Sequence, residues 1–301
     1  MDAIKLGVLD FGEGYDSLHD LITYATDADQ LGYSRFWLGE HYIFNSLWCN
    51  PEPILPLLLA YTERIRIGTA GILLSAHTPY RIAITFKQLS NMFSNRVDLG
   101  FAAGLPAGDN IRQLLHADAG AFDEKLRQVL ELLREEDNMI GNGIPVPPYR
   151  GEIPELWSLG CSCKRLDSVL ESGLNFSRSL FHEISDDAAQ KEQLRVFMER
   201  YADRHGAYPK INLAVSGICS DSEAMAKQLY KQSPYYQSAF IRCNLLGSPS
   251  YFQDTICEYA AAFGINEFIF LNLAAGIRDR LHSLRLLAPV FQLPAAHMTV
   301  Q

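Results

Sequence analysis

The 301-residue sequence has no long hydrophobic run and no cluster of basic residues. Its longest apolar segments, around 54–61 and 268–277, are much shorter than the roughly 18–20 apolar residues that a membrane-spanning helix needs. The formal charge is −9, from 26 Lys and Arg residues against 35 Asp and Glu residues. Phosphate backbones are bound by clustered cations. We therefore expect a protein that binds neither membranes nor nucleic acids.

Cysteine is sparse as well, with six residues spread along the chain. They are too few and too scattered for a disulfide framework, so we expect a reducing, cytoplasmic location. The closest pair, Cys161 and Cys163, belongs to no C-x-x-C motif and has no second ligand pair, so we expect no metal site. Residues 1–5 lead straight into an apolar run without a basic region or a cleavage signal, which predicts that no secretory leader is present.

The common catalytic sequence motifs are also missing. The chain contains no phosphate-binding G-x-x-x-x-G-K-[ST], no zinc-binding H-E-x-x-H and no nucleophile elbow G-x-S-x-G. Gly12 and Gly14 resemble the start of a dinucleotide fingerprint but lack its third glycine, so we interpret them as a turn after the first strand. Any chemistry must therefore be inferred from where polar residues fall in the fold.

Apolar, strand-like runs alternate with amphipathic, helix-like stretches along the chain, whose 48% hydrophobic and 20% charged residues are typical of a folded protein. The predicted strands cover residues 5–10, 34–38, 64–75, 96–101, 155–160, 174–177, 210–219 and 267–271. The predicted helices cover residues 16–32, 53–62, 80–93, 122–135, 164–173, 187–205, 222–230, 249–263 and 278–290. The segment 138–154, rich in proline and glycine, is interpreted as a loop inserted on one face rather than a domain boundary.

Strands that alternate with helices imply parallel pairing with right-handed crossovers. About eight such units predict a (β/α)8 TIM barrel, an α/β fold, as a single domain over residues 1–301 with loop insertions at the C-terminal rim. A doubly wound open sheet fits the alternation nearly as well, and composition alone does not choose between them.

In a parallel barrel, functional groups gather where the strands end. That rule selects Asp10, the Glu40-His41-Tyr42 segment, Ala70-Gly71, residues 102–104 and residues 160–165. His41 is the leading candidate for acid–base chemistry because imidazole titrates near neutral pH. The competing interpretation is a histidine that is simply hydrogen-bonded within a loop.

The turn formed by Gly160, Cys161 and Ser162 opens a predicted helix, and Lys164 and Arg165 follow in its first turn. The first N–H groups of a helix and nearby cations suit a phosphate group. A solvated basic turn is the alternative interpretation.

Several short motifs occur in a consistent order along the chain. They are 6–10 (LGVLD), 31–33 (LGY), 36–41 (FWLGEH), 62–69 (TERIRIGT), 77–79 (HTP) and 96–100 (RVDLG), followed by 247–249 (GSP) and 280–288 (RLHSLRLLA). Together they resemble the bacterial luciferase-like family of flavin-dependent monooxygenases. The resemblance covers most of the chain and is densest in residues 4–104.

The resemblance implies a (β/α)8 barrel that binds reduced FMN supplied by a separate NAD(P)H:flavin reductase. It implies reaction with O2 to a flavin C4a-hydroperoxide, which then oxygenates the substrate, and we expect a homodimer. His41 matches the catalytic histidine of the family. Ala70 and Gly71 match the bulge on which the flavin ring rests, often through a non-proline cis peptide. Cys161, Ser162 and Arg165 match the turn that binds the phosphate.

Two departures from the family pattern affect the flavin site. Many relatives carry an arginine after the fourth strand that pairs with the phosphate, and here Ala103 occupies that place. A hydrogen bond to a charged group is worth about 1.5–3 kcal/mol, so its loss would weaken FMN binding roughly 10–150-fold. Arg165 replaces a small hydroxyl residue typical of the family's turn, and our hypothesis is that it supplies the missing charge.

The substrate is expected to be a small organic molecule or a biosynthetic intermediate, either free or tethered to a carrier protein. The brief stretch 219–247 leaves little length for a long lid, which puts light emission in doubt. Two alternatives stay open. One is a non-catalytic partner subunit with weak or no flavin binding, favoured by Ala103. The other is an oxidoreductase of the same fold that transfers a hydride with FMN or the deazaflavin F420.

Overall fold

The computed structural model describes residues 3–182 and 187–295. Its strands are β1 (Lys5–Asp10), β2 (Arg35–Leu38), β3 (Arg66–Thr69), β4 (Ile72–Leu73), β5 (Val97–Ala102), β6 (Glu155–Gly160), β7 (Asn175–Ser179), β8 (Ile211–Cys219), β9 (Leu245–Gly247) and β10 (Glu267–Asn272). Its α-helices are α1 (Leu18–Gln30), α2 (Leu55–Tyr61), α3 (Pro79–Met92), α4 (Asp109–Leu114), α5 (Phe122–Arg134), α6 (Glu136–Gly141), α7 (Leu166–Ser172), α8 (Asp187–His205), α9 (Glu223–Lys231), α10 (Pro249–Phe263) and α11 (Ile277–Val290).

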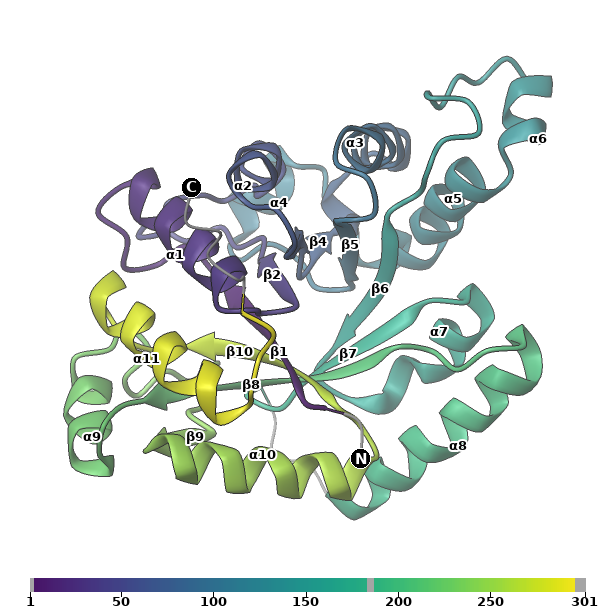
Figure 1. Cartoon of the computed structure of the whole chain (residues 1–301). Helices are drawn as coiled ribbons and strands as arrows, with labels where there is room; N and C mark the ends of the chain where they lie inside the picture. The colour runs from purple at the N-terminus through teal and green to yellow at the C-terminus, as the bar shows by residue number, and fades with distance from the viewer. Residues whose placement is uncertain (1–2, 183–186, 296–301) are drawn as a thin grey trace, which may run out of the picture.

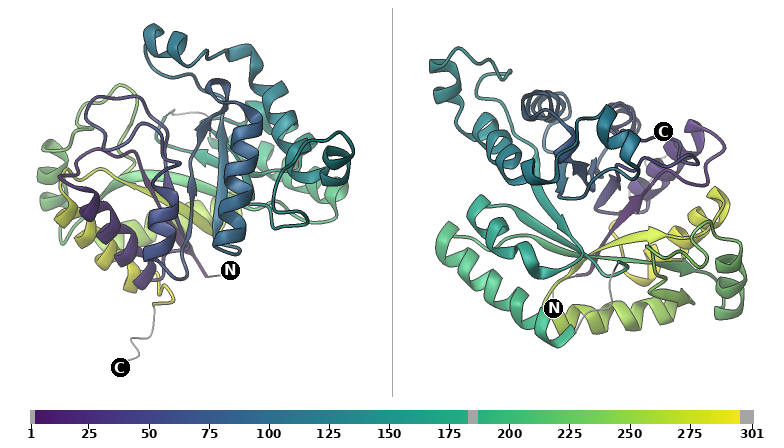
Figure 2. Two further views of the ribbon diagram at one scale, coloured as in Figure 1. Left: turned by 90° about the horizontal axis from the view of Figure 1, so that it is seen from above. Right: turned by 180° about the vertical axis from the view of Figure 1, so that it is seen from behind.

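Eight of these strands form a closed ring in which every neighbour is parallel. The order is β1-β2-β3-β5-β6-β7-β8-β10, and β10 pairs with β1 to close it. The short strands β4 and β9 lie off the ring, against β5 and β8. Figures 1 and 2 show the helices arranged around the outside of the strands. The fold is therefore the predicted TIM barrel, and the open-sheet alternative is wrong because β10 closes the ring.

Local sequence signals explain where several helices begin and end. Ser17 caps α1 by accepting from the backbone N–H of Asp20, whose carboxylate accepts from the backbone N–H of Ser17 in return. Helix α10 begins after Ser248 with a proline in its first turn and ends at Gly264, whose φ of +66° suits glycine. These signals give the two helices well-defined ends.

The structure differs from the predicted elements in four places. The predicted strand 64–75 is split into β3 and β4, with a cis peptide bond between Ala70 and Gly71 at the break. Helices α4 and α6 and strand β9 were missed, because segments of three to six residues show too little of a helical or strand period. Helix α6 begins the segment predicted as an inserted loop, which projects from the barrel in Figures 1 and 2. Within the described residues, no helix has the length and apolar character to cross a membrane.

The amino end of the barrel is filled by a buried network of charges around Arg35 of β2. Its guanidinium forms ion pairs with Asp98 of β5 at 2.6 Å, Glu155 of β6 at 2.8 Å and Glu267 of β10 at 2.7 Å. Its centre also lies 4.6 Å from the ring centroid of Trp157. Although burial would lower the pKa of Arg35, the three carboxylates raise it above its ordinary value. One cation thus joins four strands of the ring.

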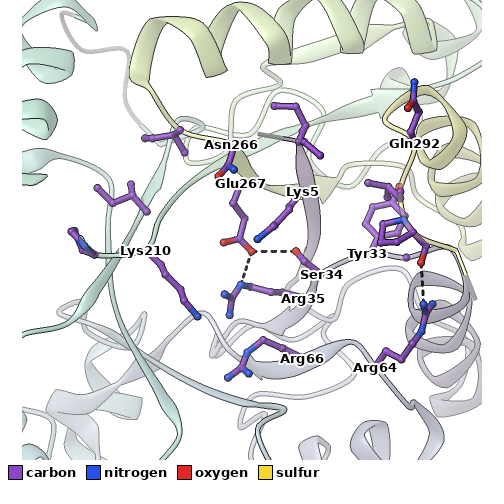
Figure 3. Close-up of a pocket in the computed structure, with 18 of the residues that line it drawn as sticks. Lys5, Tyr33, Ser34, Arg35, Arg64, Arg66, Lys210, Asn266, Glu267 and Gln292 are labelled. Atoms are coloured by element: carbon purple, nitrogen blue, oxygen red, sulfur yellow. Dashed lines mark hydrogen bonds and ion pairs between the residues drawn. The ribbon is translucent and has the colours of Figure 1, made fainter. Parts of the chain in front are cut away.

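A wide cavity of about 960 Å³ lies outside this network. Figure 3 shows the carboxylate of Glu267 bonded to both Ser34 and Arg35. Arg66 lies below Arg35 in this view, and Lys210 lies to its left. Arg66 pairs with Asp98, and Lys210 pairs with Glu155, so their charges are already matched. These matched charges indicate a structural network that closes the amino end of the barrel.

We predict that Arg35→Met lowers the free energy of unfolding by about 3–5 kcal/mol, because three carboxylates lose their buried cation. Arg127→Met on α5 is the matched control, since Arg127 is 56% exposed and pairs only with Glu124 and Glu131. The control should change the free energy by less than about 1 kcal/mol. Urea unfolding measures both, and equal losses would contradict a special role for Arg35.

Candidate functional site

A second cavity, of about 500 Å³, opens at the carboxyl ends of the barrel strands. All seven site residues predicted from the sequence line it, namely His41, Ala70, Gly71, Ala103, Cys161, Ser162 and Arg165. They come from the ends of four different strands, β2, β3, β5 and β6. The structure therefore brings the whole predicted set together, at the end of the barrel where parallel barrels carry their chemistry.

His41 follows β2 and faces this cavity. Its ring centroid lies 4.3 Å from that of Phe11, which follows β1. Burial, and to a smaller extent the neighbouring His182, lower the pKa of His41 to about 4. Glu40 opposes that change but does not outweigh it. His41 is therefore a neutral imidazole at pH 7, with one ring nitrogen able to donate a proton and one able to accept one.

The neighbouring carboxylate of Glu40 is fully buried and holds two segments of the cavity wall together. It accepts a hydrogen bond from the backbone N–H of Leu73 in β4 at 2.7 Å and one from the hydroxyl of Tyr42 at 2.7 Å. Its third partner is Nε2 of His77 at 2.8 Å. Burial alone would lower the pKa of His77, but the hydrogen bond and the charges of Glu40 and Glu52 raise it. Glu40 therefore favours the protonated form of His77 and holds its ring beside the cavity.

The wall between β3 and β4 is built from small residues. The peptide bond between Ala70 and Gly71 is cis, and the N–H of Ala70 donates to the carbonyl of Leu38 at 2.8 Å. A Cβ atom on Gly71 would lie 2.3 Å from Leu159 Cδ1 and 2.9 Å from the carbonyl oxygen of Gly100. Glycine at this position lets the chain pass close to β5 and leaves a side-chain-free wall.

The turn after β6 supplies Cys161, Ser162 and Arg165. Ser162 has an extended backbone, with φ −147° and ψ 169°, and its side chain makes no capping hydrogen bond with the turn that follows. Arg165 forms an ion pair with Asp123 of α5, and its guanidinium centre lies 4.7 Å from the ring centroid of Phe122. The side chain is still 38% exposed, so Arg165 is held at the edge of the cavity without being buried.

Ala103, at the position where the family resemblance led us to look for a phosphate-binding arginine, lines the cavity and contributes no charge to it. Among the described residues that line the cavity, Arg165 is the one permanent cation, and Glu40 is the one carboxylate. Any anionic group that enters this cavity must therefore rely on Arg165 for an opposite charge.

Residues in and after β7 also line the cavity, namely Ser177, Ser179, Phe181 and His182. None of them was among the site residues predicted from the sequence, because no residue after the predicted strand 174–177 was selected. Strand β7 in fact runs to Ser179, so the same strand-end rule, applied here, points to Phe181 and His182.

A sequence model described as luciferase-like monooxygenase matches residues 5–282 of this chain. The chain belongs to the luciferase-like monooxygenase family. Among its curated relatives, the uncharacterized protein YwcH of Bacillus subtilis is 24% identical, over 96% of this chain and 99% of that protein. The N-acetyl-S-alkylcysteine monooxygenase of Bacillus subtilis is 29% identical, over 64% of this chain and 62% of that enzyme.

Solved structures show the same luciferase-like barrel. Apo-MsnO8 superposes with a TM-score of 0.79 at 25% identity, over 97% of this chain and 100% of that one. The oxygenating constituent of 3,6-diketocamphane monooxygenase from Pseudomonas putida, solved with FMN, superposes with a TM-score of 0.73 at 17% identity. The match covers 97% of this chain and 98% of that one. An F420-dependent secondary alcohol dehydrogenase superposes with a TM-score of 0.71 at 13% identity, over 96% of this chain and 99% of that one. At such identities, the last two demonstrate a shared fold alone.

We predict that the stability of this luciferase-like protein falls as the pH falls from about 6.5 to 4, because unfolding frees His41 to bind a proton. The pKa of His41 is about 4 in the folded protein, below that of an unfolded histidine, so the unfolded chain takes up the proton first. The loss is at most about 1.4 kcal/mol per pH unit for this one group. Urea unfolding of the wild type should show a steeper decline over this range than His41→Gln, and parallel declines would contradict the assignment.

Proposed function

We propose that this protein is a flavin-dependent monooxygenase that uses reduced FMN and O2 to oxygenate a small organic molecule. One observation carries the proposal: a single cavity is lined by the neutral imidazole of His41, the small residues Ala70 and Gly71, and the cation Arg165. These groups match three needs of such a reaction, namely a proton donor and acceptor, a surface for a flat ring and a charge for a phosphate. Membership of the luciferase-like family supports the same reaction class.

The residues of the cavity fit FMN. Gly71 leaves backbone against which a planar ring can lie, and Arg165 with the hydroxyl of Ser162 offers a cation and a hydrogen bond to a phosphate. The FMN complex of the diketocamphane enzyme is a precedent for this cofactor in the same fold. Reduced FMN supplies the electrons that activate O2, and one oxygen atom then enters the substrate.

The chain itself contributes proton handling and the exclusion of water. As a neutral imidazole, His41 can accept a proton at its unprotonated ring nitrogen or donate one from the other. Leu9, Phe11, Trp37 and Ile269 form an apolar inner wall. Such a wall keeps water away from reactive groups and strengthens electrostatic interactions within the cavity.

Further proposals concern the setting of the enzyme. We propose that reduced FMN comes from a separate NAD(P)H:flavin reductase, as the resemblance to the luciferase-like family implies. All six cysteines are unpaired, which supports a reducing, cytoplasmic setting. The substrate is either free or bound to a carrier protein. The homodimer stays a prediction, which light scattering in solution checks.

The function is tested by mixing the protein anaerobically with reduced FMN and then with O2. We expect reduced FMN to bind and the visible absorbance of oxidised FMN to return more slowly than in free solution, because the enclosed cavity controls the reaction with O2. Stopped-flow absorbance measures both steps. Absence of binding would support the non-catalytic subunit, which Ala103 favours. If reduced FMN binds but is reoxidised as fast as in free solution, the result would support the hydride-transfer oxidoreductase.

The role of Arg165 gives a second prediction, on binding alone. Arg165→Ala should weaken FMN roughly 10–150-fold, the loss expected for a hydrogen bond to a charged group. Arg127→Ala is the matched control, because Arg127 lies on α5 with its own carboxylate partners and does not line the cavity. Titration by FMN fluorescence measures the dissociation constants, and an unchanged value for Arg165→Ala would end the hypothesis that Arg165 compensates for Ala103.

The ion pair of Arg165 predicts an effect of the opposite sign. Asp123 competes with a phosphate for the same guanidinium. Asp123→Asn keeps the size of the side chain and removes the competing charge, so FMN should bind more tightly than to the wild type. The same titration measures the change. Weaker binding to Asp123→Asn would mean that Asp123 orients Arg165 for the phosphate instead of competing with it.

A further inference from the structure

Four aromatic side chains form a continuous row along the cavity, with His41 and His182 at its two ends. The ring centroids of His41 and Phe11 lie 4.3 Å apart, those of Phe11 and Phe181 6.4 Å apart, and those of Phe181 and His182 4.5 Å apart. Phe11 and Phe181 meet at 69°, nearly edge to face. We call these four residues the aromatic row.

Backbone constraints hold the middle of the aromatic row in place. A Cβ atom on Gly39 would lie 2.4 Å from Phe11 Cδ1, so glycine at this position makes room for the Phe11 ring. The carbonyl of Phe181 accepts a hydrogen bond from the N–H of Arg242 at 2.9 Å. Phe11 and Phe181 are 4% and 1% exposed. The row is therefore formed before any ligand arrives, which lowers the entropic cost of binding.

The Ser179–His182 pair places a polar group at one end of the row. The Oγ of Ser179 lies 2.6 Å from Nδ1 of His182, so Nε2 is the ring nitrogen left to meet a ligand. His182 lines the cavity while keeping an exposed side chain, and desolvation lowers its pKa. Depending on its tautomer, Nε2 either donates or accepts a hydrogen bond. A hydroxyl group satisfies both cases, because it is a donor and an acceptor at once.

The charges near the row are already matched. Glu40 is paired with His77, and Arg165 is paired with Asp123 and reserved for phosphate in the proposed function. His41 is neutral at pH 7. A charged substrate would therefore lose its water of hydration at the row without gaining an opposite charge, which costs several kcal/mol.

We propose that the aromatic row and the Ser179–His182 pair form the substrate subsite, and that it selects an uncharged, flat aromatic molecule that carries a hydroxyl group. The substrate's aromatic ring lies along the row, against the exposed His182 ring and the small part of the buried Phe11 and Phe181 rings that reaches the cavity. The hydroxyl group bonds to Nε2 of His182. The inference rests on the proposed function in one respect, since it assigns the remaining volume of the cavity to FMN.

Equilibrium dialysis of the whole chain with three probes tests the subsite, at neutral pH and with and without saturating FMN. The probes are 2-naphthol, naphthalene and 2-naphthoate, which share one ring system. We expect 2-naphthol to bind more tightly than the other two, and to bind in the presence of FMN. His182→Ala should weaken 2-naphthol about threefold to tenfold, the range for one neutral hydrogen bond, and leave naphthalene unchanged.

The matched control is His282→Ala, since His282 is an exposed histidine paired with Asp221 away from the cavity. His282→Ala should leave the dissociation constants of both 2-naphthol and naphthalene unchanged. Phe181→Leu should weaken 2-naphthol and naphthalene alike, because Phe181 lies between the Phe11 and His182 rings and supports the row along which both probes lie. The FMN dissociation constant should be the same for His182→Ala and the wild type, which separates the subsite from the flavin site.

Four results would overturn the subsite. They are tighter binding of 2-naphthoate than of 2-naphthol, equal loss of naphthalene and 2-naphthol in His182→Ala, displacement of 2-naphthol by FMN, and weaker FMN binding in His182→Ala. Failure of the proposed function looks different. In that case the wild type does not bind FMN, and the probe comparison without FMN still decides whether the subsite exists.

Discussion

A single buried guanidinium underlies the arrangement of this molecule. Arg35 connects β2 to β5, β6 and β10 through three carboxylates, at distances between 2.6 and 2.8 Å. Removing Arg35 would take a buried cation from all three carboxylates at once, so the network favours the meeting of these four strands at the amino end. Because every pairing in the ring is parallel, the carboxyl ends of the strands all lie at the opposite end of the barrel. The residues after β1, β2, β3, β5, β6 and β7 consequently surround one cavity.

The cavity at the carboxyl end of the barrel differs in its electrostatics from the charge network at the amino end. Its carboxylate, Glu40, is hydrogen-bonded to His77, and its cation, Arg165, is paired with Asp123 at the edge of the cavity. The interior is left to apolar side chains and to neutral imidazoles. Such an interior suits a bound ring system and a group that carries a proton. An anion can bind strongly only at the turn after β6, because Arg165 lies there. This division of roles agrees with the chemistry of the luciferase-like family to which the chain belongs.

Much of the fold could be predicted because most barrel strands are apolar and most covering helices are amphipathic, as in 155–160 and 122–135. The short helices α4 and α6 could not, since six residues hold less than two turns of periodicity. His41 was found because it follows a strand within a family motif. The pairs Glu40–His77 and Arg165–Asp123 join residues 37 and 42 positions apart, and only the closed barrel brings them together. His182 was missed because β7, with the sequence NFSRS, is short and polar, and no residue after it was selected.

The central claim is that FMN occupies the cavity at the carboxyl end of the barrel. A crystal structure of the protein with FMN tests it most directly. We predict that the flavin ring lies against Ala70 and Gly71, and that its phosphate lies within hydrogen-bonding distance of Ser162 and Arg165. FMN in the cavity beside Arg66 and Lys210 at the opposite end, or a phosphate directed away from Arg165, would contradict the account.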